Sequence, residues 1–196
     1  MDFSEIRGFG VHADWGCNGV QEWLNFDKNR YAKMIKVAKE RFPGMNTVRI
    51  RYSFDAYMVD KKKCLQAMHD ANEILTNEGL YIVQNYFNGW FGVPAYGGFT
   101  RECVQKHQIP PYKICLRDFL DAVKDSNILV HDIANEPFNN TNCHPLAFDS
   151  IVYFLEEMAE VIRSCDDGMI TVGTQSYPNH EHTEICDIDR VVPFVD

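Results

Sequence analysis

The run of residues from Ile128 to Ala134 constrains the fold more than any other stretch of the sequence. It is dominated by apolar residues and ends abruptly in Asn135, Glu136 and Pro137. Such a short apolar run suits a strand that is buried on both faces, as in a parallel sheet covered by helices. Pro137 cannot donate to a β-ladder and biases the preceding residue towards extended geometry. The strand is therefore predicted to stop with Glu136 at its carboxyl end.

The rest of the chain repeats one plan, in which a strand is followed by a helix. The predicted strands are 6–11, 46–52, 80–86, 128–136 and 169–173, and the predicted helices are 28–41, 61–78, 112–124, 145–165 and a short 183–190. A long aromatic loop is predicted after the first strand, and 88–98 is predicted to be a functional loop rich in Gly and aromatic residues. The spacing matches the roughly 30 or more residues that a βαβ unit requires.

These units predict an α/β fold with a parallel sheet and residues 1–196 as one domain, and the family resemblance given below implies the (β/α)8 TIM-barrel type. A closed barrel of eight strands usually takes about 250 residues, and about 200 at the least. This sequence spends its length on about five β/α units, and 191–196 is interpreted as the first residues of a sixth strand. We therefore expect the amino-terminal part of a barrel, truncated after about five units. Its open sheet edge would favour self-association.

Composition argues against several classes of partner and of metal or disulfide site. The formal net charge of -9 argues against nucleic acid and anionic membrane surfaces, since both favour clustered Lys and Arg. No run approaches the roughly 20 apolar residues of a membrane span. Seven cysteines without a C-x-x-C pair argue against a disulfide framework and a zinc site, and Cys64, Cys115 and Cys165 are predicted to be buried thiols. No basic-then-apolar leader opens the chain, so we expect a cytoplasmic protein if Met1 is the native start and a secreted protein otherwise.

Glu136 is the main candidate for catalysis. Chemistry in α/β barrels takes place at the carboxyl ends of the strands, and a carboxyl group there suits a general acid. Asn135 beside it offers an amide to a substrate hydroxyl. Strict alternation would send Asn135 and Glu136 to opposite faces, so the strand end is predicted to bulge or bend. The alternative interpretation of Asn135, Glu136 and Pro137 is a plain strand exit followed by a turn.

Arg49 is the second candidate for the site. It lies between Val48 and Ile50 in a predicted strand, where a guanidinium among apolar neighbours requires an acidic partner. Arg51 is interpreted instead as a member of a peripheral ion pair or as a loop anchor.

The residues from Asp132 to Pro137 resemble the fourth-strand signature of the clan A retaining glycoside hydrolases, especially the family 5-like cellulases and mannanases. The resemblance runs along the chain in order, from the first strand to the start of the sixth. It implies that Glu136 is the acid/base, that Asn135 contacts a sugar 2-hydroxyl and that Arg49 orients the catalytic carboxylates. It also implies an oligosaccharide or polysaccharide substrate and no cofactor.

Further sugar contacts are predicted near the third and fifth strands. Asn88 and Trp90 follow the third strand, where they would present an amide and an indole face to a sugar, although a Trp packed on the barrel rim is the alternative. Tyr177 follows the fifth strand and is a further candidate to line the cleft. The sequence departs from the family at 86–88, where family 5 members usually carry a His pair, and at His131, where an aromatic residue such as Trp is common.

The second carboxylate is the main gap in the resemblance. A retaining mechanism requires two carboxylates about 5 to 5.5 Å apart, and the family places its nucleophile on a seventh strand. Asp132 and Glu181 are the candidates within this chain, although neither matches the family's pattern. His180 and His182 flank Glu181, but this is a weak metal pattern without identifiable partner ligands, so no metal site is predicted.

The sequence thus predicts hydrolysis of O-glycosidic bonds in β-linked carbohydrates by a retaining mechanism. The alternative is a catalytically inactive half-barrel that binds carbohydrate, or an inactive truncated fragment.

Overall fold

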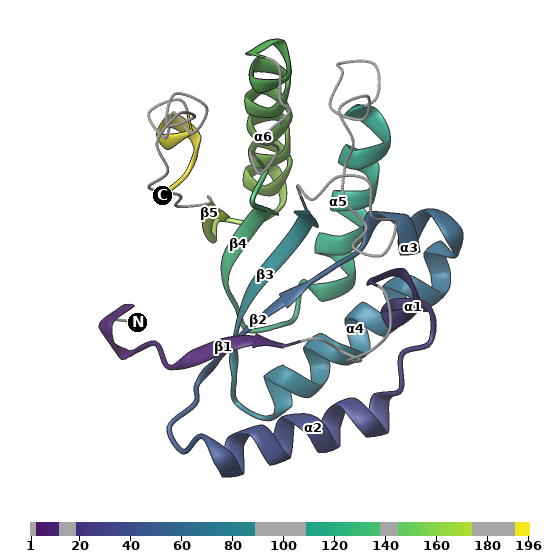
Figure 1. Cartoon of the computed structure of the whole chain (residues 1–196), viewed down its shortest axis with the longest axis vertical. Coiled ribbons are helices and arrows are strands. Elements are labelled where there is room, and N and C mark those ends of the chain that lie inside the picture. The colour runs from purple at the N-terminus through teal and green to yellow at the C-terminus, as the bar shows by residue number, and fades with distance from the viewer. Residues whose placement is uncertain (1–2, 12–18, 89–108, 138–144, 174–190) are drawn as a thin grey trace.

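The computed structural model describes residues 3–11, 19–88, 109–137, 145–173 and 191–196. Within these ranges the chain forms a five-stranded sheet flanked by helices (Figure 1). The strands are β1 (Gly8–Val11), β2 (Thr47–Arg51), β3 (Tyr81–Asn88), β4 (Ile128–Asn135) and β5 (Met169–Gly173). The helices are α1 (Gly19–Leu24), α2 (Lys28–Arg41), α3 (Phe54–Val59), α4 (Lys61–Asn77), α5 (Ile109–Val123) and α6 (Pro145–Cys165), with 3-10 turns η1 (Phe3–Glu5) and η7 (Val192–Phe194).

The strands follow one another across the sheet in chain order, and all neighbouring pairs are parallel. This is the arrangement expected of consecutive β/α units. All five predicted strands and the first four predicted helices form, with shifted ends, so the predicted α/β class is confirmed. The helix predicted at 183–190 lies outside the described residues.

Two short helices lie in connections where no helix was predicted. α1 interrupts the predicted aromatic loop after β1, and α3 connects β2 to α4. Each has six residues, which is too short for an apolar stripe to repeat. Ser53 begins α3, because its hydroxyl oxygen accepts a hydrogen bond from the backbone N–H of Ala56.

The predicted start of a sixth strand at 191–196 is wrong for most of that segment. Residues 192–194 form η7, whose Pro193 has no N–H to donate to a ladder. The chain then becomes extended at Val195, and the backbone N–H of Asp196 donates to the Ile170 carbonyl oxygen over 2.9 Å. Asp196 Oδ2 also accepts a hydrogen bond from the Ile170 N–H over 2.8 Å. The edge of β5 is therefore bonded to Asp196 at this point.

The hydrophobic core lies between the sheet and its helices. Alternate residues of β2, namely Val48 and Ile50, are almost fully buried, as are Tyr86 of β3 and Ile133 of β4. Each large apolar side chain buried in this way contributes about 1.5–3 kcal/mol. The core also contains the buried thiols of the helices, Cys64 and Cys115, as predicted. Cys165 is exposed instead, because it is the last residue of α6.

The remaining alternate residues of the sheet include charged and amide side chains among apolar ones. β2 presents Arg49 and Arg51, which are only partly buried, and the register of the parallel pairs places Asn85 of β3 beside Asp132 of β4. Arg49, Asn85 and Asp132 belong to the candidate site described below.

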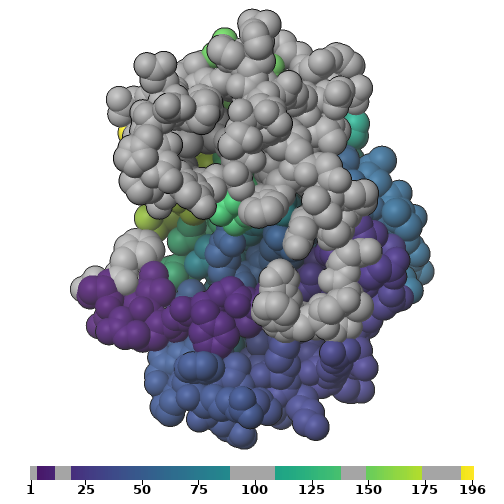
Figure 2. Space-filling view, viewed as in Figure 1, coloured from purple at the N-terminus to yellow at the C-terminus, as the bar shows by residue number. Residues whose placement is uncertain are grey.

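Among the described residues, β1 forms an exposed edge of the sheet. β1 pairs only with β2 among the described strands, and its residues are mostly exposed. It forms part of the purple surface in the space-filling view (Figure 2). No helix in the described part of the chain is long and apolar enough to cross a membrane.

Candidate active site

Arg49, Asn88 and Asn135 come together from three adjacent strands. Arg49 Nη2 donates to Asn135 Oδ1 over 3.0 Å, and Asn135 Nδ2 donates to Asn88 Oδ1 over 3.4 Å. Asn88 and Asn135 are register partners and are the last residues of β3 and β4. Asn88 is buried and lies on the strand, whereas the sequence placed it just past the strand end. The structure thus unites three of the predicted site residues at the carboxyl edge of the sheet.

Asp132 is the acidic partner that the sequence predicted for Arg49. Arg49 Nε and Nη2 both donate to Asp132 Oδ2, over 2.9 and 2.6 Å. The backbone N–H of Gly173 donates to the other carboxylate oxygen over 3.1 Å. Burial raises the pKa of Asp132, although the charge and hydrogen bonds of Arg49 and the N–H of Gly173 oppose this effect. Both oxygens of this carboxylate therefore have hydrogen-bond partners among the described residues.

Glu136 follows directly after β4 and is partly buried. Its backbone N–H donates to the Gly173 carbonyl oxygen over 2.6 Å. Its φ is 48°, so the predicted extended geometry is wrong. The chain turns here through the left-handed region, while the register between β4 and β5 shifts between Asp132 and Asn135. The predicted irregularity at the end of this strand is thereby confirmed.

Two residues that the sequence did not single out also belong to this cluster. Asn85 is buried, and its Nδ2 donates to the backbone oxygen of Asp132 over 3.3 Å. Gly173 packs so closely that an added Cβ would lie 3.2 Å from the Ala134 carbonyl oxygen and 3.4 Å from Arg49 Nη2. Amide side chains in the interior of a strand are a usable signal for Asn85, and its neighbour Gln84 carries the same signal. Gly173 carries no such signal, because its role comes from pairing between strands.

The other predicted residues, namely Trp90, Tyr177, Glu181 and the two histidines that flank Glu181, lie outside the described residues.

The family model described as cellulase, glycosyl hydrolase family 5, matches residues 4–192. The chain belongs to this family. The matched range contains every residue of the cluster described above, from Arg49 to Gly173. A comparison with curated proteins gave no match.

Solved structures share the fold of this family 5 chain. A β-1,4-D-mannanase from Cryptopygus antarcticus is 17% identical with a TM-score of 0.58, over 86% of this chain and 56% of that one. A glycoside hydrolase family 5 enzyme from Prevotella bryantii B14 is 14% identical with a TM-score of 0.61, over 85% and 54%. A β-1,4-mannanase from the sea hare Aplysia kurodai is 15% identical with a TM-score of 0.60, over 91% and 63%. The chain thus spans a little more than half the length of these structures, and its five units match part of their TIM-barrel fold.

His131, one of the departures from the family pattern, lies away from the Arg49 cluster. It is buried, and one ring nitrogen, Nδ1, lies 2.7 Å from the hydroxyl oxygen of Tyr86. The other, Nε2, lies 3.2 Å from Asp166 Oδ1, just before the amino end of β5. Burial lowers the pKa of His131. We interpret this residue as part of the core of the family 5 fold.

One group of described residues has the spacing of metal ligands but is explained by ion pairs. His69, Asp70 and Glu73 cluster on α4, and they form the one group with possible metal-ligand spacing in the described part of the chain. Lys28 Nζ bonds to both carboxylates of that group, over 3.2 and 2.7 Å. This is an exposed ion-pair cluster on the outside of the fold.

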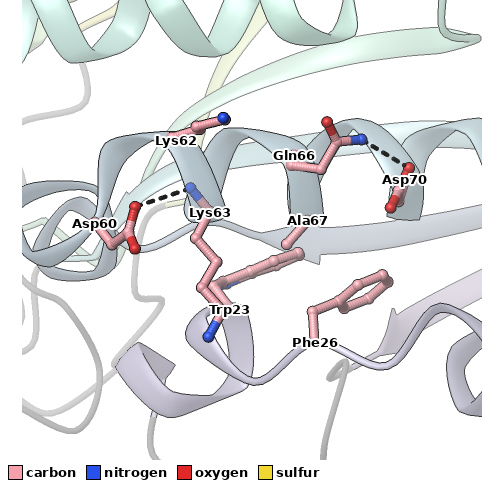
Figure 3. Close-up of a pocket in the computed structure, with 8 residues that line it drawn as sticks. All are labelled: Trp23, Phe26, Asp60, Lys62, Lys63, Gln66, Ala67 and Asp70. Atoms are coloured by element: carbon pink, nitrogen blue, oxygen red, sulfur yellow. Dashed lines mark hydrogen bonds between the residues drawn. The ribbon is translucent and has the colours of Figure 1, made fainter.

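A hollow on the helical surface also lies apart from the cluster (Figure 3). Trp23 and Phe26 face Ala67 of α4 there, and the lining also includes Asp60 and charged or polar residues of the same helix. Its lining shares no residue with the Arg49 cluster, so it is not part of the candidate active site.

Proposed function

We propose that residues 1–196 form the amino-terminal part of one catalytic domain that hydrolyses β-linked glucan, mannan or galactoside by a retaining mechanism. The observation that carries this proposal is the contact of Arg49 with Asn135, directly before Glu136 at the carboxyl end of β4. Family membership supports glycoside hydrolysis in general. Two of the structures with the same fold are named as mannanases, which makes mannan a first substrate to test.

In this proposal Glu136 is the acid/base. It donates a proton to the leaving oxygen in the first step and accepts a proton from the attacking water in the second. Asn135 binds a sugar hydroxyl, and Arg49 holds Asn135 in place. Asn88, Trp90 and Tyr177 are proposed as further substrate contacts, and no cofactor is required for this chemistry.

The nucleophile in this proposal is a carboxylate outside the described residues. Asp132 is a poor candidate, since Arg49 and the Gly173 N–H hold its two oxygens. The same observation favours the second candidate function, in which the chain binds a β-linked sugar without turnover.

Turnover and binding together test the proposal. The 196-residue chain is assayed on aryl β-glucosides, β-mannosides and β-galactosides, and its binding of cellotetraose and mannotetraose is measured by calorimetry. Glu136→Gln should lower kcat by about 10²- to 10⁴-fold, because it removes general acid–base catalysis. Glu73→Gln, an exposed site on α4, is the matched control and should retain full activity.

Each outcome decides between the two candidate functions. Turnover that survives Glu136→Gln would refute the assignment of the acid/base. Saturable sugar binding without turnover, weakened in Asn135→Ala, would support the binding function. A chain that neither binds nor hydrolyses any of these sugars would overturn both.

A further inference from the structure

We propose that Asp132 and Gly173 are positioning residues, which together set the orientation of the Asn135 amide and the place of the Glu136 peptide. The importance of this arrangement for substrate rests on the function proposed above. The arrangement itself is carried by contacts among β2, β4 and β5.

The first step runs from Asp132 to Arg49. Arg49 belongs to β2 and Asp132 to β4, and the two are joined by two charge-assisted hydrogen bonds to one carboxylate oxygen. A long Arg side chain loses rotamer entropy when it is held in one direction, so it needs such an anchor. Asp132 is suited to be that anchor because it is almost fully buried, with 2% of its surface exposed.

The second step runs from Arg49 to Asn135. A side-chain amide has a donor end and an acceptor end, and its neighbours decide which end points where. Arg49 has only donors, so it selects the acceptor, and its Nη2 donates to Asn135 Oδ1 over 3.0 Å. Nδ2 is consequently the end that faces Asn88. In the proposed function, the second N–H of this Nδ2 group is the donor to the oxygen of a sugar hydroxyl.

The third step connects this pair to Glu136 through Gly173. The N–H of Gly173 donates to Asp132 Oδ1, and its carbonyl oxygen accepts from the N–H of Glu136. One residue of β5 thus fixes both the anchor carboxylate and the peptide of the proposed acid/base. The close packing around its Cα, with Ala134 and Arg49 within 3.4 Å of an added Cβ, leaves little room to move.

The chain provides a matched control at the other end of the same strand. Asp166 accepts a hydrogen bond from the backbone N–H of Gly168 over 2.6 Å and contacts a basic ring, that of His131. Like the Asp132 carboxylate, the Asp166 carboxylate contacts both a glycine N–H and a basic side chain. Unlike Asp132, it has no contact with Arg49 or Asn135 among those described for the site.

The experiment compares Asp132→Asn, Gly173→Ala and Asp166→Asn in the full chain. Side-chain NMR signals of the Arg49 Nε–H and the Asn135 amide protons report the geometry whether or not the chain is active. Cellotetraose and mannotetraose affinity, and kcat on the aryl β-glycosides, report its consequence. Asp132→Asn should shift both NMR signals and weaken binding or kcat by about 10- to 100-fold, as expected for a misplaced site. Asp166→Asn should leave all of these readouts as in the parent chain.

The outcomes separate this inference from the proposed function. Unchanged Arg49 and Asn135 signals in Asp132→Asn would overturn the positioning role, even if the parent chain is active. A parent chain that is inactive and binds no sugar defeats the proposed function, while the NMR comparison still decides the positioning. If Asp132→Asn does not fold, the same signals in Gly173→Ala decide it, since the added Cβ lies only 3.2 Å from the Ala134 carbonyl oxygen and must displace the strand end that carries Asn135 and Glu136.

Discussion

At the scale of single residues, the backbone of Glu136 is the most unusual feature of the site. A φ of 48° places a residue with a side chain in the left-handed region. Such a conformation costs an L-residue roughly 1–2 kcal/mol, and the surrounding structure must maintain it. The hydrogen bond from its N–H to Gly173 is one contact that does so.

This strain predicts that a glycine variant at position 136 is more stable than an alanine variant, which reverses the usual order of stability. At position 136, Glu136→Gly should be more stable than Glu136→Ala by about 1 kcal/mol, because glycine has no Cβ to oppose a positive φ. At Val83, inside β3, the alanine variant should instead be more stable than the glycine variant by about 0.5–1 kcal/mol. Urea denaturation of the four variants measures both differences. The same order at the two positions would contradict the strained backbone.

His131 predicts how stability depends on pH. Burial lowers its pKa in the folded chain, and the contact with Asp166 opposes this in part. The folded state therefore binds this proton less tightly than the unfolded state does. The contribution of His131 to the free energy of unfolding is fully present above the unfolded pKa of about 6.5 and decreases as the pH falls through that value. Each unit of separation corresponds to about 1.4 kcal/mol. Burial tends to raise the pKa of Asp166, but hydrogen bonds from Gly168 and His131 outweigh it and lower this pKa. Asp166 therefore also makes the fold less stable as the pH falls, at a lower pH than His131 does.

The measurement is the free energy of unfolding at pH 8, 7, 6 and 5 for the parent chain and His131→Gln. The variant cannot take up this proton, so its stability should fall less between pH 7 and pH 5. His69→Gln, which changes an exposed histidine on α4, is the control for loss of a ring outside the core. Parallel slopes in the parent chain and His131→Gln would refute the role of the buried ring.

The site was partly predictable from residue types alone. Arg49 stood out because a guanidinium between apolar strand neighbours needs an acid, and Asn135 and Glu136 stood out because a strand ends there. The identity of the acid was not predictable, since Asp132 lies 83 positions further along the chain and meets Arg49 only through the strand register. Gly173 was missed for the same reason.

At the scale of elements, helix α2 offers a clean test of a sequence signal. Its predicted start at Lys28 agrees with the structure, where Asp27 Oδ1 accepts hydrogen bonds from the N–H groups of Asn29 and Arg30, both over 3.0 Å. Asp27→Ala should lower the free energy of unfolding by about 1 kcal/mol, because it removes this cap. Asp27→Ser keeps a capping oxygen and should retain most of the stability. Equal losses in the two variants, measured by urea denaturation, would exclude the cap as the cause.

The predictability of the other elements follows their length. α4 and α6 have 17 and 21 residues, long enough for an apolar stripe to repeat over several turns. α1 and α3 are short and were missed. β3 was predicted to end at Tyr86 but continues to Asn88, because register pairing with Ala134 and Asn135 of β4 extends it. Pairing partners cannot be read from the strand itself.

At the scale of the whole molecule, the two edges of the sheet differ. β5 is bonded at Ile170 to both the backbone and the side chain of Asp196. Arg163 of α6 reinforces this contact, with Nη2 2.5 Å from Asp196 Oδ2. β1 has no described strand on its outer side, and Phe9 in its middle is 38% exposed. We therefore propose that self-association of this chain takes place through β1.

Sedimentation velocity over a range of concentrations tests this proposal. The parent chain should show a concentration-dependent increase in sedimentation coefficient, because an edge strand with exposed apolar residues is a template for pairing with another chain. Phe9→Lys should shift the chain towards monomer, since a charged residue on an edge strand opposes such pairing. Met58→Lys on α3, which removes an exposed apolar side chain away from the sheet edge, should associate like the parent chain. A parent chain that stays monomeric, or two variants that behave alike, would show that β1 does not act as an interface.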